Sequence, residues 1–290
     1  GQTALMWAVA QHHPDAVARL LAGGANVHAR SDVWSEVMAA PPHGQPEYNR
    51  EIPHGGNTAL MFAARGGDVA SARTLIAAGA NVDDTDAWGV SATTLAAHAG
   101  FGELVALLLE AGADPNIGVE YTTPLFEAIA RNQPEVVRIL LNAGLDPNQK
   151  IREEWPLYIT QEADEIMIAL LQGGADLNLQ ESREEPFLFK SIEEGKIEVV
   201  RALLKAGADP NRAPSDFPGI TPLKRAIEDL DPKPEIIKLL LESGADPNIG
   251  DDYRTPLKEA VWSAVHAAEE NGDGAVAQMQ GVELLLGAGA

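Results

Sequence analysis

The sequence contains no cysteine. Disulfide bonds, thiolate nucleophiles and cysteine-ligated zinc sites are therefore excluded. Long apolar runs are also missing: no stretch reaches about 18 consecutive apolar residues, so no transmembrane helix is predicted. The sequence has no phosphate-cradling glycine loop or nucleotide fingerprint, and no motif places a serine nucleophile beside a base. We therefore predict that these residues form no enzyme and need no cofactor.

Basic residues are scarce. The chain has 21 lysines and arginines against 43 aspartates and glutamates, which gives a formal net charge of −22. Such a field repels phosphate backbones and anionic membrane surfaces, so we expect neither nucleic acid nor a membrane as a partner. It favours a basic protein or peptide. A second interpretation stays open, in which the charge only maintains solubility.

One short motif recurs eight times along the chain. Its clearest copy is Leu-Leu-Leu-Glu-Ala-Gly-Ala-Asp-Pro-Asn at residues 107–116. The leucines are typical of a helix end that faces a core, the glycine supplies a left-handed residue that stops the helix, and proline blocks its continuation. The residue after this glycine falls at positions 25, 80, 113, 145, 175, 208, 245 and 288. The base period is therefore about 33 residues, the length of a turn plus two helices.

A helix start precedes each copy of the motif. Thr-Pro-Leu, or a variant of it, begins at Thr3, Thr58, Ser91, Thr123, Trp155, Pro186, Thr221 and Thr255. Threonine or serine caps the free amides of a first turn, and proline is preorganised just inside it. With both halves of the motif in phase, the chain resembles the ankyrin-repeat family over nearly all of its length.

The resemblance implies an all-α solenoid of about eight helix-turn-helix repeats with finger hairpins. The family usually has a histidine after Thr-Pro-Leu, and this histidine makes a buried hydrogen bond. The histidine is absent here, so we expect local packing to replace that hydrogen bond. The place is taken in this chain by Met6, Met61, Thr94, Phe126, Tyr158, Phe189, Lys224 and Lys258. We expect the leucines of the terminating motif, such as Leu108 and Leu204, to lie in the core.

We expect one array over residues 1–290. Its repeats lie approximately at 1–30, 55–86, 87–118, 119–150, 151–183, 184–213, 214–250 and 251–290, with an insertion at 31–54. The insertion is predicted to be a long finger loop with one helical turn near residues 33–39, dispensable for folding. Both ends of the chain fall inside repeats, so we interpret it as an excised piece whose compartment is unassigned. A soluble monomer is favoured.

The insertion also carries a weak candidate for a metal site. Imidazole and carboxylate together bind zinc and other divalent metals. The residues concerned are His43, Glu47, Glu51 and His54. Their spacing matches no recognised ligand pattern, so a solvated loop without metal is the favoured interpretation.

The resemblance implies that a protein partner docks on the concave groove, built from finger tips and exposed first-helix positions. Aromatic rings at finger tips are unusual in a chain with only 5% aromatic residues, and such rings are frequent interface hot spots. The predicted binding residues are Trp88, His98, Tyr121, Arg131, Glu193, Glu194, Phe217, Glu228, Asp229 and Tyr253. We therefore expect a protein-protein interaction module for a basic protein or peptide. The alternatives are a structural spacer and the regulatory arm of a larger protein whose catalytic part lies outside this chain.

Overall fold

The structure is a computed structural model. It describes residues 1–39, 49–118, 123–151, 153–160, 163–179, 187–214, 219–228, 233–250, 255–269 and 274–290. Within these residues the chain forms helix pairs and one β-hairpin. It divides into two compact units, Gly1–Gly173 and Gly174–Ala290, which are described separately below.

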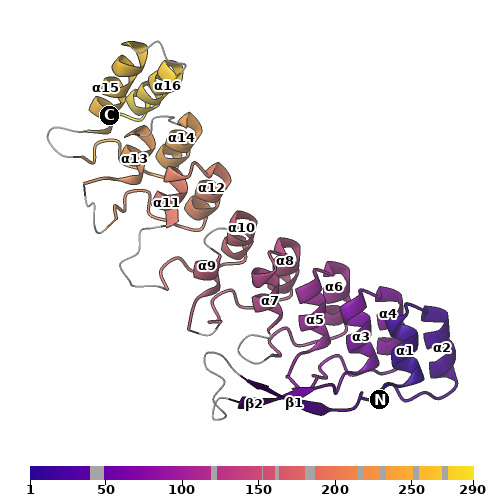
Figure 1. The fold of residues 1–290 in the computed structure, drawn as a ribbon. Coiled ribbons are helices and arrows are strands. Elements are labelled where there is room, and N and C mark those ends of the chain that lie inside the picture. The colour runs from indigo at the N-terminus through magenta and orange to yellow at the C-terminus, as the bar shows by residue number, and fades with distance from the viewer. Residues whose placement is uncertain are drawn as a thin grey trace. The chain divides into compact units, whose positions relative to one another are not determined.

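The first unit consists of five helix pairs. Their bounds are α1 Ala4–Ala10 with α2 Pro14–Ala22, α3 Ala59–Gly66 with α4 Val69–Ala77, α5 Ala92–Ala99 with α6 Gly102–Glu110, α7 Pro124–Ala130 with α8 Pro134–Asn142, and α9 Pro156–Ile159 with α10 Asp164–Gln172. The first helices α1, α3, α5, α7 and α9 pack side by side in one row (Figure 1). The second helices α2, α4, α6, α8 and α10 form the other row.

The second unit repeats this arrangement with three pairs. They are α11 Phe187–Glu193 with α12 Ile197–Lys205, α13 Pro222–Glu228 with α14 Pro234–Glu242, and α15 Pro256–Glu269 with α16 Gly274–Gly287. Here α13 packs between α11 and α15, and α14 packs between α12 and α16. The prediction of an all-α repeat array of helix pairs is thus confirmed.

The helix ends follow the local chemistry of the motif. The hydroxyl of the predicted capping residue accepts the N–H three residues on, as Thr58 does from Met61 (3.4 Å) and Ser91 from Thr94 (3.1 Å). At the other end, the terminating glycine has a positive φ in the first seven repeats, for example +92° at Gly112. In the eighth repeat Gly287 still belongs to α16, and Gly289 takes the positive φ instead. A residue with a Cβ is strained there, so the glycine fixes where the helix stops.

In seven repeats the turn after the second helix is held by a side-chain oxygen. In five repeats an aspartate Oδ1 accepts the N–H of the asparagine two residues later, as Asp114 does from Asn116 (2.9 Å). In the first two repeats an asparagine takes the acceptor's place, and Asn26 accepts from His28 (3.0 Å). These short contacts explain why the motif continues past its glycine with Asp-Pro-Asn or a variant of it.

The core corrects the assignment of one leucine. Leu108 is fully buried, as expected, but Leu204 is half-buried while the preceding Leu203 is fully buried. The same holds for Leu140 and Leu141 of the first unit. In these two repeats the first leucine of the terminating pair is buried and the second is half-buried. In the first unit, a Cβ on Gly173 would come within 2.8 Å of Leu141 Cδ1.

The insertion is a β-hairpin, so the predicted helical turn near residues 33–39 is wrong. Strand β1 (Trp34–Ala39) pairs antiparallel with β2 (Asn49–His54), and Trp34 lies opposite His54. An isolated bridge joins Arg30, four residues before Trp34, to Thr58, four residues after His54. The bridge and the hairpin therefore have the same register. The finger's own pairing thus continues into the insertion, and the ladder satisfies backbone groups that a single helical turn would leave open.

Replacing residues 31–54 with a short finger is expected to leave the melting temperature nearly unchanged. The reason is that α1 packs directly on α3, and α2 on α4, without help from the hairpin. The measurement is thermal unfolding followed by circular dichroism. Loss of the folded state would show instead that Trp34, or another residue of the insertion, is needed to hold the first two repeats together.

Candidate functional site

Three rings that are far apart in the sequence meet at the fingers of the first unit. Trp34 from β1 stacks on His54 from β2, with ring centroids 4.5 Å apart and planes inclined by 25°. Trp88, from the next finger, meets His54 edge-on at 6.4 Å and 61°. Trp34 remains 57% exposed and Trp88 44% exposed. We call Trp34, His54 and Trp88 the ring platform.

Backbone contacts hold the ring platform together. The Ala87 N–H donates to the Gly55 carbonyl (3.1 Å), which ties the base of the hairpin to the finger that carries Trp88. Asp86 Oδ1 accepts from the N–H groups of Trp88 (2.8 Å) and Val90 (3.0 Å), which shapes that finger's tip. Gly55 has φ +93°, and a Cβ there would collide with the Asp32 backbone, so glycine is required for the two strands to come this close.

The first-helix row of this unit changes character along its length. In the first three repeats the outward position holds Trp7, Phe62 and Leu95, and Trp7 is as exposed as Trp34. Arg65 lies over the Phe62 ring, with its guanidinium carbon 6.0 Å from the ring centroid. These repeats therefore present an apolar and aromatic surface to solvent.

Ion pairs join the third and fourth repeats of this row. His98 Nδ1 lies 2.7 Å from Glu127 Oε2, and Arg131 Nε lies 3.9 Å from the same oxygen. The first-helix row therefore brings three residues of neighbouring repeats together, two of them predicted binding residues. Since Glu127 is engaged on both sides, it is not a free carboxylate for a partner.

The second unit neutralises its predicted carboxylates in the same way. Glu193 pairs with Arg225 of the next repeat (2.8 Å), Glu194 with Lys196 (2.8 Å), and Glu228 with the buried Lys224 (3.9 Å). The pairs of Glu193 and Glu194 are partly exposed and contribute little to stability. They do lower the free negative charge of the row, so the field felt by a partner there is weaker than the sequence alone indicates.

The Lys196 ammonium donates a hydrogen bond to Glu194 and holds the pKa of that carboxyl below its usual value, with Lys190 acting in the same direction. A lowered pKa in the folded state stabilises the fold at neutral pH. This contribution is lost as the pH falls through that lowered pKa. The pair is well exposed, so the contribution is small.

Several predicted residues cannot be placed. Tyr121, Phe217, Asp229 and Tyr253 lie outside the described residues, as do His43 and Glu47 of the weak metal candidate. Glu51 belongs to β2, and the His54 ring packs against Trp34. Within the described part of the chain, no group of three or more histidines and carboxylates is arranged to hold a metal ion.

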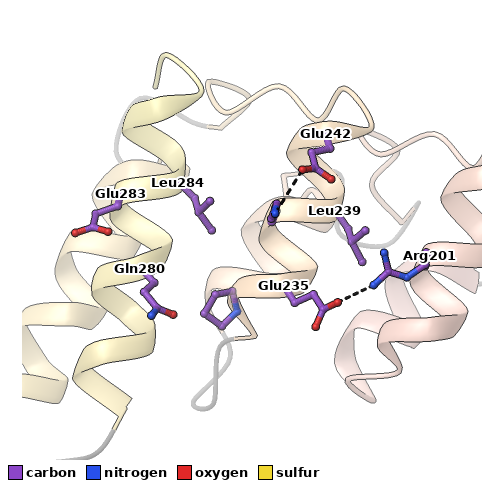
Figure 2. A pocket seen from close by; sticks show the side chains of 9 residues that line it. Arg201, Glu235, Leu239, Glu242, Gln280, Glu283 and Leu284 are labelled. Atoms are coloured by element: carbon purple, nitrogen blue, oxygen red, sulfur yellow. Dashed lines mark hydrogen bonds and ion pairs between the residues drawn. The ribbon is translucent and has the colours of Figure 1, made fainter.

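The second-helix row of the second unit carries a hollow of about 520 Å³ that sequence reasoning did not predict (Figure 2). Leu239 and Leu284 lie among its lining residues, with Arg201 and Glu235 at one side. Arg201 Nη2 lies 2.6 Å from Glu235 Oε1, and Lys238 Nζ lies 3.8 Å from Glu242 Oε1. These four charged side chains are paired with one another, whereas the ring platform exposes two tryptophans to solvent.

Two of the rings were visible in the sequence only as isolated aromatics. The sequence predicts Trp88 as a binding residue because it lies at a finger tip, but Trp34 is not among the predicted binding residues. Its partner His54 was considered only as a metal ligand. The sequence does contain a signal for this pair. Trp34 lies four residues after Arg30, and His54 lies four residues before Thr58. The two rings therefore face each other once the hairpin extends the pairing of Arg30 with Thr58. Separately, no helix among the described residues is long and apolar enough to cross a membrane.

Comparisons with known proteins agree on the repeats. A family model described as ankyrin repeats in three copies matches residues 60–151 and 157–251, and one for a single ankyrin repeat matches residues 1–32. Rabankyrin-5 from Mus musculus is 31% identical over 199 residues, and the Homo sapiens protein is 32% identical over the same length. These matches cover 61% of this chain, which spans only 15% of the length of either relative.

Among solved structures, the human ASB11 ankyrin repeat domain is similar over 100% of this chain and 99% of its own. Its sequence is 21% identical, and the TM-score is 0.46.

Proposed function

Because the chain belongs to the ankyrin-repeat family, whose repeats generally mediate protein-protein interaction, we propose that it binds a basic protein or peptide on one face. That face is the first-helix row with its finger segments. The observation that carries the proposal is the exposure of Trp7, Trp34 and Trp88, which all belong to this row or its fingers. Large rings left in solvent are typical hot spots of protein interfaces.

Electrostatics supports a basic partner. The net charge of −22 raises the association rate of a positively charged segment and makes it depend on salt. Because Glu193, Glu194 and Glu228 are paired with cations, we assign the long-range attraction to the net charge of the whole chain and the short-range affinity to the rings. The same charge disfavours nucleic acid and anionic membranes as partners.

The spacer and the regulatory arm remain the alternatives. A spacer needs no exposed rings on one row, and it predicts that no protein binds the isolated array. The relatives called Rabankyrin-5 are far longer than this chain, so activities of a whole protein of that kind are not carried over to it.

The test compares two double variants with the unchanged chain as baits for capturing proteins, followed by quantitative mass spectrometry and cross-linking. Trp7→Ala with Phe62→Ala removes rings from the first-helix row. Lys238→Ala with Glu242→Ala alters the second-helix row and is the matched control. We expect a set of basic proteins that is retained by the control and depleted by the ring variant, and cross-links that map to the first-helix row and the fingers.

Two results would contradict the proposal. Depletion by the control variant alone would move the interface to the second-helix row. The absence of any reproducible partner would favour the spacer. Raising the salt concentration should slow association with a captured partner, because screening weakens long-range attraction.

A further inference from the structure

We infer that the ring platform of Trp34, His54 and Trp88 binds an arginine side chain of the partner. The inference rests on the proposed function, since the arginine belongs to the basic segment that the array binds. It goes further by assigning one side-chain type to one place on the surface.

His54 stacks on one face of Trp34 at a centroid distance of 4.5 Å. Trp34 is still 57% exposed, and we assign this exposure to the opposite face and the ring edges. An indole face carries a negative quadrupole and is the aromatic surface that attracts a cation most strongly. A guanidinium is planar and weakly hydrated, so it stacks on such a face more readily than a compact ammonium does.

The second tryptophan supports the stacked pair. Trp88 stands edge-on to His54 at 61°, and close to half of its surface is open. Because His54 lies on the covered face of Trp34, a side chain on the open face meets one indole. Trp88 acts on that site through the histidine that backs it.

The surroundings carry the charge that an arginine requires. The finger segments 26–35, 81–90 and 113–118 contain five aspartates and one arginine. That arginine, Arg30, is already engaged: it donates to Asp84 Oδ1 (2.7 Å), to the Thr85 carbonyl (2.6 Å) and to the Gly56 carbonyl (3.1 Å). Asp32, two residues before Trp34, is 81% exposed and contacts the Gly1 amino group. The platform thus lies beside three finger segments rich in aspartate, and the one arginine of these segments is held by its own fingers.

The platform is also preorganised. The hairpin keeps the register of the finger from Arg30–Thr58 to Trp34–His54, and the hydrogen bond from Ala87 to Gly55 fixes the next finger beside it. Rings held in place before binding lose little conformational entropy when a partner arrives. This favours a site that binds a single side chain of the partner.

The chain offers a matched control in its last repeat. Trp262 is 58% exposed and packs against His266, with ring centroids 4.0 Å apart and planes inclined by 33°. Tryptophan and histidine there are four residues apart on one helix, α15, and the described residues place no second tryptophan against them. Loss of Trp262 therefore removes an exposed ring of equal size without touching the platform.

The experiment measures binding of three synthetic nonapeptides to the full chain by isothermal titration calorimetry: nona-arginine, nona-lysine and nona-citrulline. Nona-arginine is expected to bind several-fold more tightly than nona-lysine, and the uncharged citrulline peptide is expected not to bind. Trp34→Ala should weaken nona-arginine binding by about 5-fold or more, and Trp88→Ala, which removes only the support of His54, should weaken it less. Trp34→Phe should restore part of the affinity, and Trp262→Ala should leave it unchanged.

Equal affinities for the arginine and lysine peptides would overturn the inference, because binding would then follow charge alone. So would equal losses for Trp34→Ala and Trp262→Ala. A thermal melt of each variant checks that the fold is retained, and the phenylalanine variant keeps the test decisive if Trp34→Ala unfolds the hairpin. The proposed function is judged separately: if nona-arginine ignores the platform but the Trp7 and Phe62 variant still loses captured proteins, only this inference fails.

Discussion

Replacing Leu108 with alanine is expected to lower the free energy of unfolding by about 2–5 kcal/mol. Leu108 is fully buried in α6, which packs between α4 and α8. Truncation removes apolar contacts and leaves a cavity, because neighbouring repeats of fixed spacing collapse only partly into the gap. Urea unfolding followed by circular dichroism measures the change.

The neighbouring residue provides the control. Leu109 lies in the same helix but is only half-buried, so Leu109→Ala should cost clearly less. Hydrogen exchange should show the loosening spread to the repeats that contain α4 and α8, since each repeat is stabilised by its neighbours. Equal costs for Leu108 and Leu109 would contradict the assignment of the core face.

Replacing Leu203 with alanine should have an effect of similar size in the second unit, again about 2–5 kcal/mol. Leu203 is fully buried in α12, whereas Leu204 is half-buried. Leu204→Ala is therefore the matched variant, with the same chemical change at a site that water already reaches. The expected order is a large loss at Leu203 and a smaller one at Leu204.

Hydrogen exchange read separately over residues 1–173 and 174–290 is the sharper measurement here. The Leu203 variant should lose protection first in α12 and in its neighbour α14. The reverse order of costs would restore the sequence-based expectation that Leu204 is the core residue. It would also require a different rotation of α12 about its axis.

The helix pairs were predictable because their signals are local. A threonine such as Thr58 caps an N–H three residues away, and a glycine such as Gly112 ends a helix through its own φ angle. Eight copies of these signals in phase fix the period. The class of fold and the approximate position of each repeat therefore follow from residues that are neighbours in the chain.

The rotation of each helix was less predictable. Leucines at adjacent positions such as Leu203 and Leu204 both match an apolar stripe, and the sequence assigns neither of them to the core with certainty. Burial depends on which repeat packs against that face. Only the packing of α12 against its neighbours decides that Leu203 turns inward.

The candidate site was decided by tertiary structure. His98 and Glu127 are 29 residues apart, and Glu193 and Arg225 are 32 apart, so their pairing arises only once the repeats stack. Trp34, His54 and Trp88 come together because the hairpin keeps the finger's register and Ala87 bonds to Gly55. Sequence alone determined that this chain is an array with charged and aromatic residues on its surface. Contacts between repeats decide which charges are paired and which rings meet. Ion pairing and ring stacking act over a few ångströms in space, and they do not follow the period of about 33 residues in the sequence.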